Sequence, residues 1–121
     1  DKSLVRLEAH DHAVDGERLA EEILKAPAPP SAIMCSSDLI AAGALRAARG
    51  MGLRVPRDIA IAGFDDSPFA QSLDPALTTV SIPAYDMGRA AADLLIRAIK
   101  GNAIDQPHVV LPTTLMRRDS A

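Results

Sequence analysis

Two short apolar runs with one amphipathic segment between them constrain the fold of this chain more than any other feature. The runs cover residues 32–35 and 59–64, and each has the length of a strand that is covered on both faces. The segment from Asp38 to Gly52 carries apolar residues at helical spacing and ends on a glycine suited to the left-handed position after a helix. A strand, a helix and a second strand in this order predict a parallel βαβ unit with a right-handed crossover.

The rest of the chain extends the same alternation. Further elements are predicted over residues 4–9, 78–82 and 109–116 as strands, and over residues 15–25 and 85–100 as helices. Asp15 is the expected cap of the first of these helices, and Pro112 limits the last strand to a sheet edge or a bend. The sequence therefore predicts an α/β fold, a parallel sheet flanked by helices in the manner of a Rossmann-like lobe.

Composition narrows the possible functions. Hydrophobic residues make up 48% of the 121 residues and aromatic residues only 2%, so we expect an aliphatic core. A net charge of -3 with scattered basic residues argues against a nucleic-acid-binding surface. Cys35 is the only cysteine, which excludes an intrachain disulfide and fits a cytosolic protein with a buried thiol. The sequence begins at Asp1 with neither Met nor a signal peptide, so we expect a piece of a longer protein.

Polar residues follow three of the predicted strands at the points where the strands end. They are His10-Asp11-His12, Ser36-Ser37-Asp38 and Asp65-Asp66-Ser67. In open α/β sheets, ligands bind outside the carboxyl ends of the strands, and parallel strands bring those ends to one edge. Either Ser37 or Asp38 must cap the helix that follows, which leaves at most one of them for a ligand.

The adjacent carboxylates of Asp65 and Asp66 have different expected roles. Asp66 or Ser67, directly before Pro68, suits the cap of a helix. Asp65 lies one residue too early for that role and follows the buried strand directly. An acceptor-only carboxylate there suits a donor-rich ligand, such as the adjacent hydroxyls of a sugar. On the residues alone, ligand binding and a plain strand end both stay open for Asp65.

An α/β enzyme in which Asp65 and Asp66 hold a divalent cation is the rival interpretation from a different class. A phosphoryl-transfer site also needs a cationic side chain, and no lysine lies at the predicted edge. The lysines are Lys2, Lys25 and Lys100. Common nucleotide-binding and hydrolase motifs are missing, and His10, Asp11 and His12 do not make a closed metal site. We therefore predict no enzyme activity, no catalytic residue, no metal and no cofactor.

The chain resembles the lac repressor/galactose repressor (LacI/GalR) family of bacterial transcription regulators. The similar run is PSAIMCSSDLIAAGALRAARGMGLRVPRDIAIAGFDDSPFAQSLDPALTTVSIPAYDMGRAAADLLIRAI, and the GFDD, GLRVPRDIAIAGFDD and PALTTV…MG elements together carry it. The resemblance implies the effector-binding region of a cytoplasmic repressor with a two-lobed, periplasmic-binding-protein-like fold. A small effector, a sugar or a related polyol or nucleoside, would close the lobes and change operator affinity. DNA would be bound only through a headpiece that this sequence lacks.

The resemblance also implies the residues that bind the effector. Asp65 would contact effector hydroxyls, and Ser37, where the family often has Asn, would face the effector. Asp11 and His12 follow the first predicted strand, and Asp11 takes the position where the family often has a stacking aromatic residue. Ile82 stands where Gln is common, which is a second departure from the family pattern.

A homodimer and a division of the chain follow from the same resemblance. The implied interface residues are Leu39, Ala42, Leu45 and Leu73, and the opposite helix stripe can cover the sheet with Ile40, Ala44, Ala47 and Ala48. Residues 1–83 would form the C-terminal lobe, residues 84–116 a returning helix and strand that pack on the other lobe, and residues 117–121 a tail. We therefore expect Met87 and Leu95 of the returning helix not to pack on the lobe's own sheet.

An extracytoplasmic sugar-binding protein that serves a transporter is the alternative with the same fold. A signal peptide upstream of this sequence would identify the transport protein. An upstream helix-turn-helix segment would identify the repressor.

Overall fold

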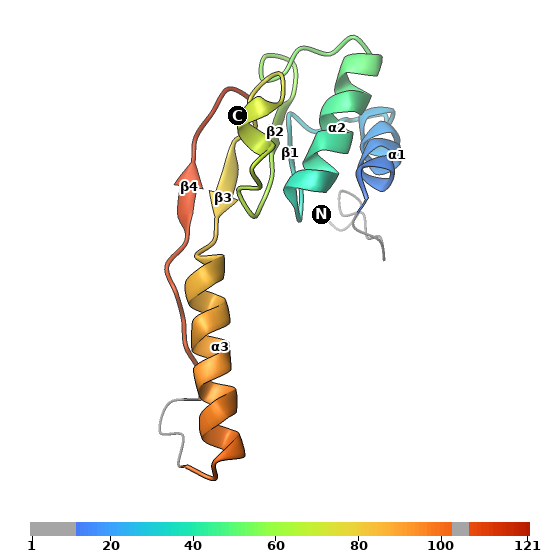
Figure 1. Cartoon of the computed structure of the whole chain (residues 1–121). Coiled ribbons are helices and arrows are strands. Elements are labelled where there is room, and N and C mark those ends of the chain that lie inside the picture. Colours follow the sequence, from blue (N-terminus) through green and yellow to red (C-terminus); the bar gives the residue numbers. More distant parts are fainter. Residues whose placement is uncertain (1–11, 103–106) are drawn as a thin grey trace. The chain divides into compact units, whose positions relative to one another are not determined.

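The computed structural model describes residues 12–102 and 107–121, and the chain divides into two compact units. Unit 1 holds the described residues up to Ser81 together with residues 115–121, and unit 2 holds those between Ile82 and Thr114. The elements, labelled in Figure 1, are α1 (Ala13–Leu24), β1 (Ala32–Met34), α2 (Asp38–Gly50), β2 (Ala60–Ala62), the 3-10 helix η2 (Ala70–Ser72), β3 (Thr79–Ser81), α3 (Ala84–Ile99) and β4 (Thr114–Met116).

The predicted βαβ unit is confirmed in unit 1. Strands β1 and β2 pair in parallel, with Ala32 opposite Ala60, and α2 connects them along the chain. Two parallel bridges, Ala62 to Thr78 and Asp65 to Ser81, join the far end of the β2 segment to the β3 segment. Strand β3 in turn pairs with β4. The strand predicted over residues 4–9 lies outside the described residues.

The core of unit 1 is aliphatic, as the composition predicts. Its fully buried members include Ala41, Ala44, Ala48, Ile59, Ile61 and Leu77. The burial of Ile59 and Ile61 agrees with the predicted buried strand. The prediction that both faces of residues 32–35 are covered is wrong, because Met34 is 62% exposed and no described element covers it.

The ends of helix α2 follow the sequence signals. Ser37 is the N-cap residue, and its hydroxyl accepts a hydrogen bond of 3.2 Å from the backbone N–H of Ile40. At the other end Gly52 has a φ of 74°, and the N–H of Leu53 donates to the carbonyl of Ala48 over 2.9 Å. This pattern satisfies carbonyl groups that the end of a helix leaves without intrahelical donors.

Helix α1 begins two residues before the predicted position. Its N-cap residue is His12, which makes no side-chain capping bond, and Asp15 lies in the first turn. The prediction that Asp15 caps this helix is therefore wrong. A carboxylate in the first turn still stabilises the helix, because it lies near the positive end of the helix dipole.

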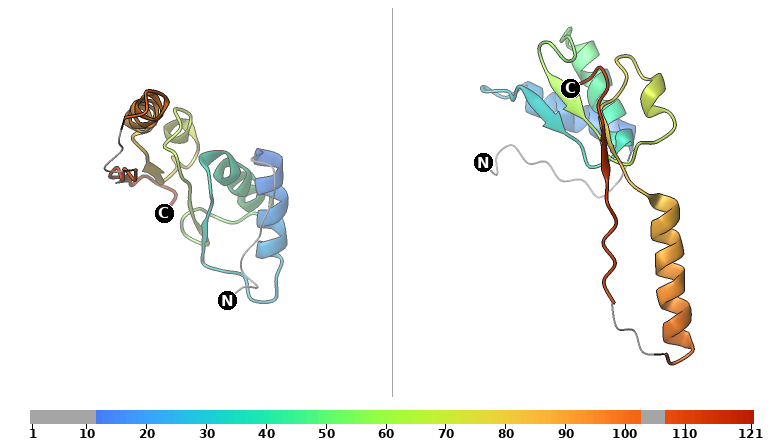
Figure 2. Two further views of the ribbon diagram at one scale, coloured as in Figure 1. Left: turned by 90° about the horizontal axis from the view of Figure 1, so that it is seen from below. Right: turned by 90° about the vertical axis from the view of Figure 1, so that its left-hand side faces the viewer.

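Helices α1 and α2 lie side by side (Figure 2) and touch through backbone atoms at two glycines. A Cβ atom added to Gly43 would lie 2.0 Å from the carbonyl oxygen of Ala13, and one added to Gly16 would lie 2.2 Å from that of Ile40. Gly43 lies next to Ala42, one of the expected interface residues, and has no Cβ atom to keep another helix at a distance. The helix that approaches it is α1 of the same chain.

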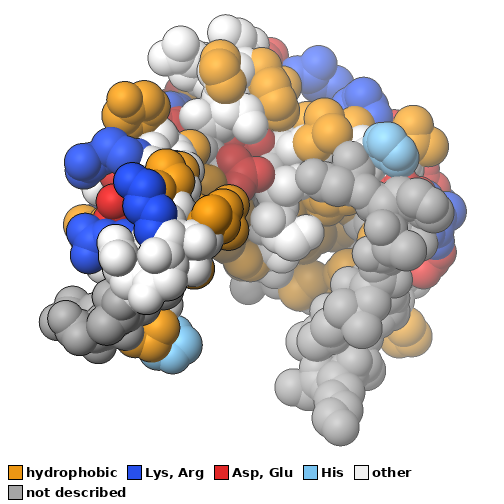
Figure 3. Space-filling model, turned by 60° about the horizontal axis from the view of Figure 1, so that its bottom comes forward, with side chains coloured by type: hydrophobic (Ala, Val, Ile, Leu, Met, Phe, Trp, Pro, Cys, Tyr) orange, Lys and Arg blue, Asp and Glu red, His pale blue; other side chains and the backbone are white. Residues whose placement is uncertain are grey.

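Helix α3, in unit 2, has no buried residue. Met87 and Leu95 are 47% and 61% exposed. Exposed hydrophobic side chains are visible over the face drawn in Figure 3. The strand predicted over residues 109–116 is limited to Thr114–Met116. That α3 packs on another lobe stays a prediction.

None of the described helices has the length and apolarity that a bilayer-crossing segment requires.

We predict that Cys35 is chemically inert in the folded chain. It is buried, and burial raises the pKa of its thiol from 9.0 to about 12. Since the thiolate is the reactive form, iodoacetamide at about pH 8 should label Cys35 only after denaturation. The folded state holds the thiol proton more tightly, so stability should also fall as the pH rises from 9.0 toward about 12. Equal labelling rates in the folded and denatured protein would contradict this prediction.

Candidate functional site

The ends of several elements meet at one edge of unit 1. Helices α1 and α2 both begin there, and β1 and β2 both run toward it (Figure 1). His12 precedes α1, Ser37 precedes α2, and Asp65 follows β2. The predicted meeting of strand ends at one edge thus holds for β1 and β2. Asp11, the fourth expected ligand residue, lies outside the described residues.

The Asp65-Asp66 pair forms a tight turn at this edge. The φ angles of Asp65 and Asp66 are 106° and 56°, in the region that residues other than glycine rarely adopt. The backbone N–H of Asp65 donates to the carbonyl of Val80 over 2.9 Å, and the N–H of Asp66 donates to Thr79 Oγ1 over 3.4 Å. Such a conformation costs on the order of 1–3 kcal/mol per residue, so it persists only where surrounding contacts fix it.

The two carboxylates of the turn have different surroundings. Asp65 is exposed, whereas Asp66 Oδ1 forms an ion pair of 2.6 Å with Arg118 Nη2. The prediction that Asp66 or Ser67 caps a helix is wrong. The next helical element is the short η2, which makes no side-chain capping bond, and charge-assisted pairing with Arg118 holds the Asp66 carboxylate instead.

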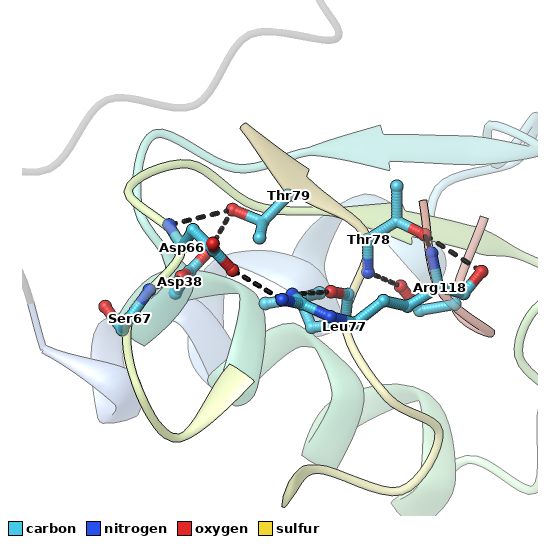
Figure 4. A network of polar contacts seen from close by, with 8 residues as sticks. Asp38, Asp66, Ser67, Leu77, Thr78, Thr79 and Arg118 are labelled. Carbon is cyan, nitrogen blue, oxygen red and sulfur yellow. Dashed lines mark hydrogen bonds and ion pairs between the residues drawn. The ribbon is translucent and has the colours of Figure 1, made fainter. Parts of the chain in front are cut away.

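Asp38 fastens the turn to the start of α2. Its side chain is fully buried, and it accepts hydrogen bonds from Thr79 Oγ1 over 2.5 Å and from the backbone N–H of Ser67 over 2.6 Å (Figure 4). The N–H of Asp38 donates to the carbonyl of Phe64 over 2.8 Å. An added Cβ on Gly63 would lie 2.4 Å from Asp38 Oδ1, so a side chain there would displace the carboxylate. Of the two possible caps, Ser37 therefore caps the helix and Asp38 supports the turn.

Residues 117–121, which the sequence predicts as a tail, belong to unit 1 and are joined to it by hydrogen bonds of Arg118 and Ser120. Ser120 is fully buried, and its hydroxyl donates to the carbonyl of Ile61 over 2.6 Å. The same hydroxyl accepts from the backbone N–H of Thr78 over 2.8 Å. Buried backbone groups require such partners, but nothing in the local pattern of residues 117–121 indicates which groups they will meet.

A carboxylate accepts hydrogen bonds, so the arrangement at this edge suits a ligand that is rich in donors. Asp65 is exposed there, and the Asp66 carboxylate pairs with the guanidinium of Arg118. Within the described part of the chain, no group of three His, Cys, Asp or Glu side chains is placed to hold a metal ion.

The expected dimer residues have mixed surroundings. Leu39 is 38% exposed and Ala42 is half-buried on α2, whereas Leu73 packs against the edge of the core. Leu45 is only 7% exposed and belongs to the core. The core of unit 1 therefore buries Leu45, whereas Leu39 on the same stripe is partly exposed. The role of this stripe in a dimer stays a prediction.

Comparisons with known proteins agree with this geometry. A family model described as a periplasmic binding protein-like domain matches residues 3–121. The HTH-type transcriptional repressor CytR of Escherichia coli strain K12 is 38% identical over 105 residues, which cover 87% of this chain and 31% of that protein. The chain thus spans about a third of the length of this relative.

Two solved structures are similar over nearly the whole chain. The complex of the transcriptional regulator CelR with cellobiose has a TM-score of 0.91 and 38% identity, and the match covers 100% of this chain and 37% of that one. The lac repressor dimer bound to operator and an anti-inducer has a TM-score of 0.82 and 30% identity, over 90% and 38% of the two chains. The chain belongs to the family of periplasmic binding protein-like domains. It is similar to one part of CytR, of CelR and of the lac repressor.

Proposed function

We propose that this chain is the effector-binding region of a bacterial transcriptional repressor. Its ligand is a small polar molecule, a carbohydrate or a related polyol or nucleoside, bound at the edge that His12, Ser37 and Asp65 mark. The observation that carries the proposal is the exposed residue Asp65. It lies in a turn that partly buried polar contacts hold in place. The similar CelR structure contains cellobiose, which supports the carbohydrate class.

The proposed mechanism is a population shift. A carboxylate accepts hydrogen bonds from adjacent hydroxyl groups and thereby selects the ligand. Binding favours one arrangement of two lobes over another, and the favoured arrangement changes the affinity of a separate DNA-binding part for its operator. The net charge of -3 is consistent with DNA being bound elsewhere. The protein acts in the cytoplasm and catalyses no reaction.

A ligand screen tests this function. The protein, expressed at full length, is heated with each member of a panel of mono- and disaccharides, polyols and nucleosides, and with Mg²⁺ and Mn²⁺ as controls. One class of hydroxyl-rich compound should raise the melting temperature, since a ligand at about 100 times its Kd stabilises the folded state by about 2.7 kcal/mol. A melting temperature that rises only with a divalent cation would favour the enzyme instead.

We further propose that the protein is a homodimer in which α2 contributes to the interface. Leu39 is partly exposed on this helix, and the similar lac repressor structure is a dimer. We expect Leu39→Arg to give monomers in sedimentation velocity, because a buried unpaired charge is costly at an interface. Val14→Arg, at a residue that is 72% exposed on α1, is the matched control and should leave the dimer intact. An unchanged dimer for Leu39→Arg would exclude this interface.

A further inference from the structure

We infer that Arg118 is a positioning residue for Asp65, to which it is connected through the Asp66 carboxylate. This inference rests on the proposed function, because it assigns Arg118 a role in effector binding at the same edge. Arg118 lies 52 positions from Asp66 in the sequence, yet their side chains pair over 2.6 Å and are each no more than 20% exposed.

The turn needs support from outside itself. Both of its residues have positive φ, and the isolated chain does not favour that conformation for aspartate. Asp65 is held through its backbone N–H on Val80, and Ser67 through its N–H on Asp38. Between these two fixed points the Asp66 carboxylate pairs with Arg118 over 2.6 Å, whereas the N–H of Asp66 reaches Thr79 Oγ1 at the longer distance of 3.4 Å.

Arg118 is itself rigidly held, as Figure 4 shows. Its Nη1 donates to the carbonyl of Leu77 over 2.8 Å, and its backbone N–H donates to Thr78 Oγ1 over 2.9 Å. The guanidinium therefore joins the carbonyl of Leu77, just before β3, to the carboxylate of Asp66. A planar guanidinium can make both contacts at once, whereas the single ammonium group of lysine is a point charge.

The two aspartates therefore have different roles. Arg118 draws the Asp66 carboxylate toward the interior, and this fixes the backbone on which the exposed Asp65 side chain stands. Without Arg118 the turn can adopt other φ angles, and the Asp65 carboxylate then leaves the position in which it meets ligand hydroxyls. The fold itself keeps the contacts of Asp38 and Ser120.

Hydrogen exchange of the full-length protein tests the effect on the turn. In Arg118→Met, peptides that cover residues 64–67 should exchange about ten-fold faster or more, as for the loss of a charge-assisted hydrogen bond, while peptides from α2 should be unchanged. Arg118→Lys should lie between Arg118→Met and wild type. Arg117→Met, at an exposed neighbour, is the matched control and should match wild type.

Titration of the same variants with the panel of sugars, polyols and nucleosides tests the effect on binding. Arg118→Met should weaken the best compound by about ten-fold or more, and Arg117→Met should leave its affinity unchanged. Equal acceleration of exchange throughout unit 1, or unchanged affinity despite a faster turn, would overturn the positioning role. If no panel compound binds wild type, the proposed function fails and so does the role in binding. A local exchange effect would then show only that Arg118 fixes the turn.

Discussion

Gly43→Ala should lower the free energy of unfolding by about 3 kcal/mol or more, at the upper end of overpacking effects. The added Cβ would lie 2.0 Å from the carbonyl oxygen of Ala13 and 2.6 Å from the backbone nitrogen of Glu17. These are backbone atoms of α1, so no side-chain rotation relieves the overlap. The two helices must separate, which exposes core residues beneath them.

Gly88→Ala is the matched control for this prediction. Gly88 also lies inside a helix, but nothing lies within 4 Å of the Cβ that alanine would add. The same substitution there should stabilise the protein by about 0.5–1 kcal/mol, because alanine favours the helix more than glycine does. Urea unfolding followed by circular dichroism measures both changes. A Gly43→Ala variant as stable as wild type would show that α1 and α2 do not touch at this position.

Asp38→Ala should cost about 3–5 kcal/mol of stability, because it leaves two buried or partly buried hydrogen-bond donors without their acceptor. The substitution leaves the Thr79 hydroxyl and the Ser67 N–H without their buried acceptor, and each lost partner costs about 1–3 kcal/mol. The removed carboxylate also lies in the first turn of α2, where negative charge is stabilising.

Two further variants separate the charge of Asp38 from its shape. Asp38→Asn keeps one acceptor oxygen and nearly the same volume, so its loss of stability should be smaller than that of Asp38→Ala. Asp93→Ala removes an exposed carboxylate that pairs with Arg97 on α3, and it should cost no more than about 0.5 kcal/mol. Thermal unfolding of the three variants gives the order. An Asp38→Ala variant no less stable than Asp93→Ala would contradict the buried role of Asp38.

Local sequence signals predict the regular part of this fold well. The βαβ unit, the Ser37 cap and the positive φ of Gly52 all depend on residues a few positions apart, and periodicity and capping preferences describe such short-range effects. The exposed position of Asp65 follows from the same reasoning, because the residue comes directly after a buried strand. Its role in binding stays a prediction.

Long-range pairing accounts for what sequence reasoning missed. Asp38 and Thr79 are 41 positions apart. In the local sequence, Asp38 fits the start of a helix and Thr79 fits a strand. The sequence predicts Arg118 to be part of a terminal tail. Only folding brings it to Asp66. A glycine such as Gly43 permits close helix approach, but it does not specify whether the approaching helix belongs to the same chain. Neither hydrophobic periodicity nor capping preference indicates which distant residues will pair.

Calorimetric titration of the full-length wild type and its Asp65→Ala variant, with the panel compound that stabilises the wild type most, tests the central claim directly. Asp65 is expected to accept two hydrogen bonds from ligand hydroxyls. Since hydrogen bonds to a charged group contribute roughly 1.5–3 kcal/mol each, Asp65→Ala should lose about two or more decades of affinity. Asp74→Ala, at a side chain that is 94% exposed, should bind as wild type does. An Asp65→Ala variant that folds and binds the compound with wild-type affinity would contradict the claim that this edge is the effector site.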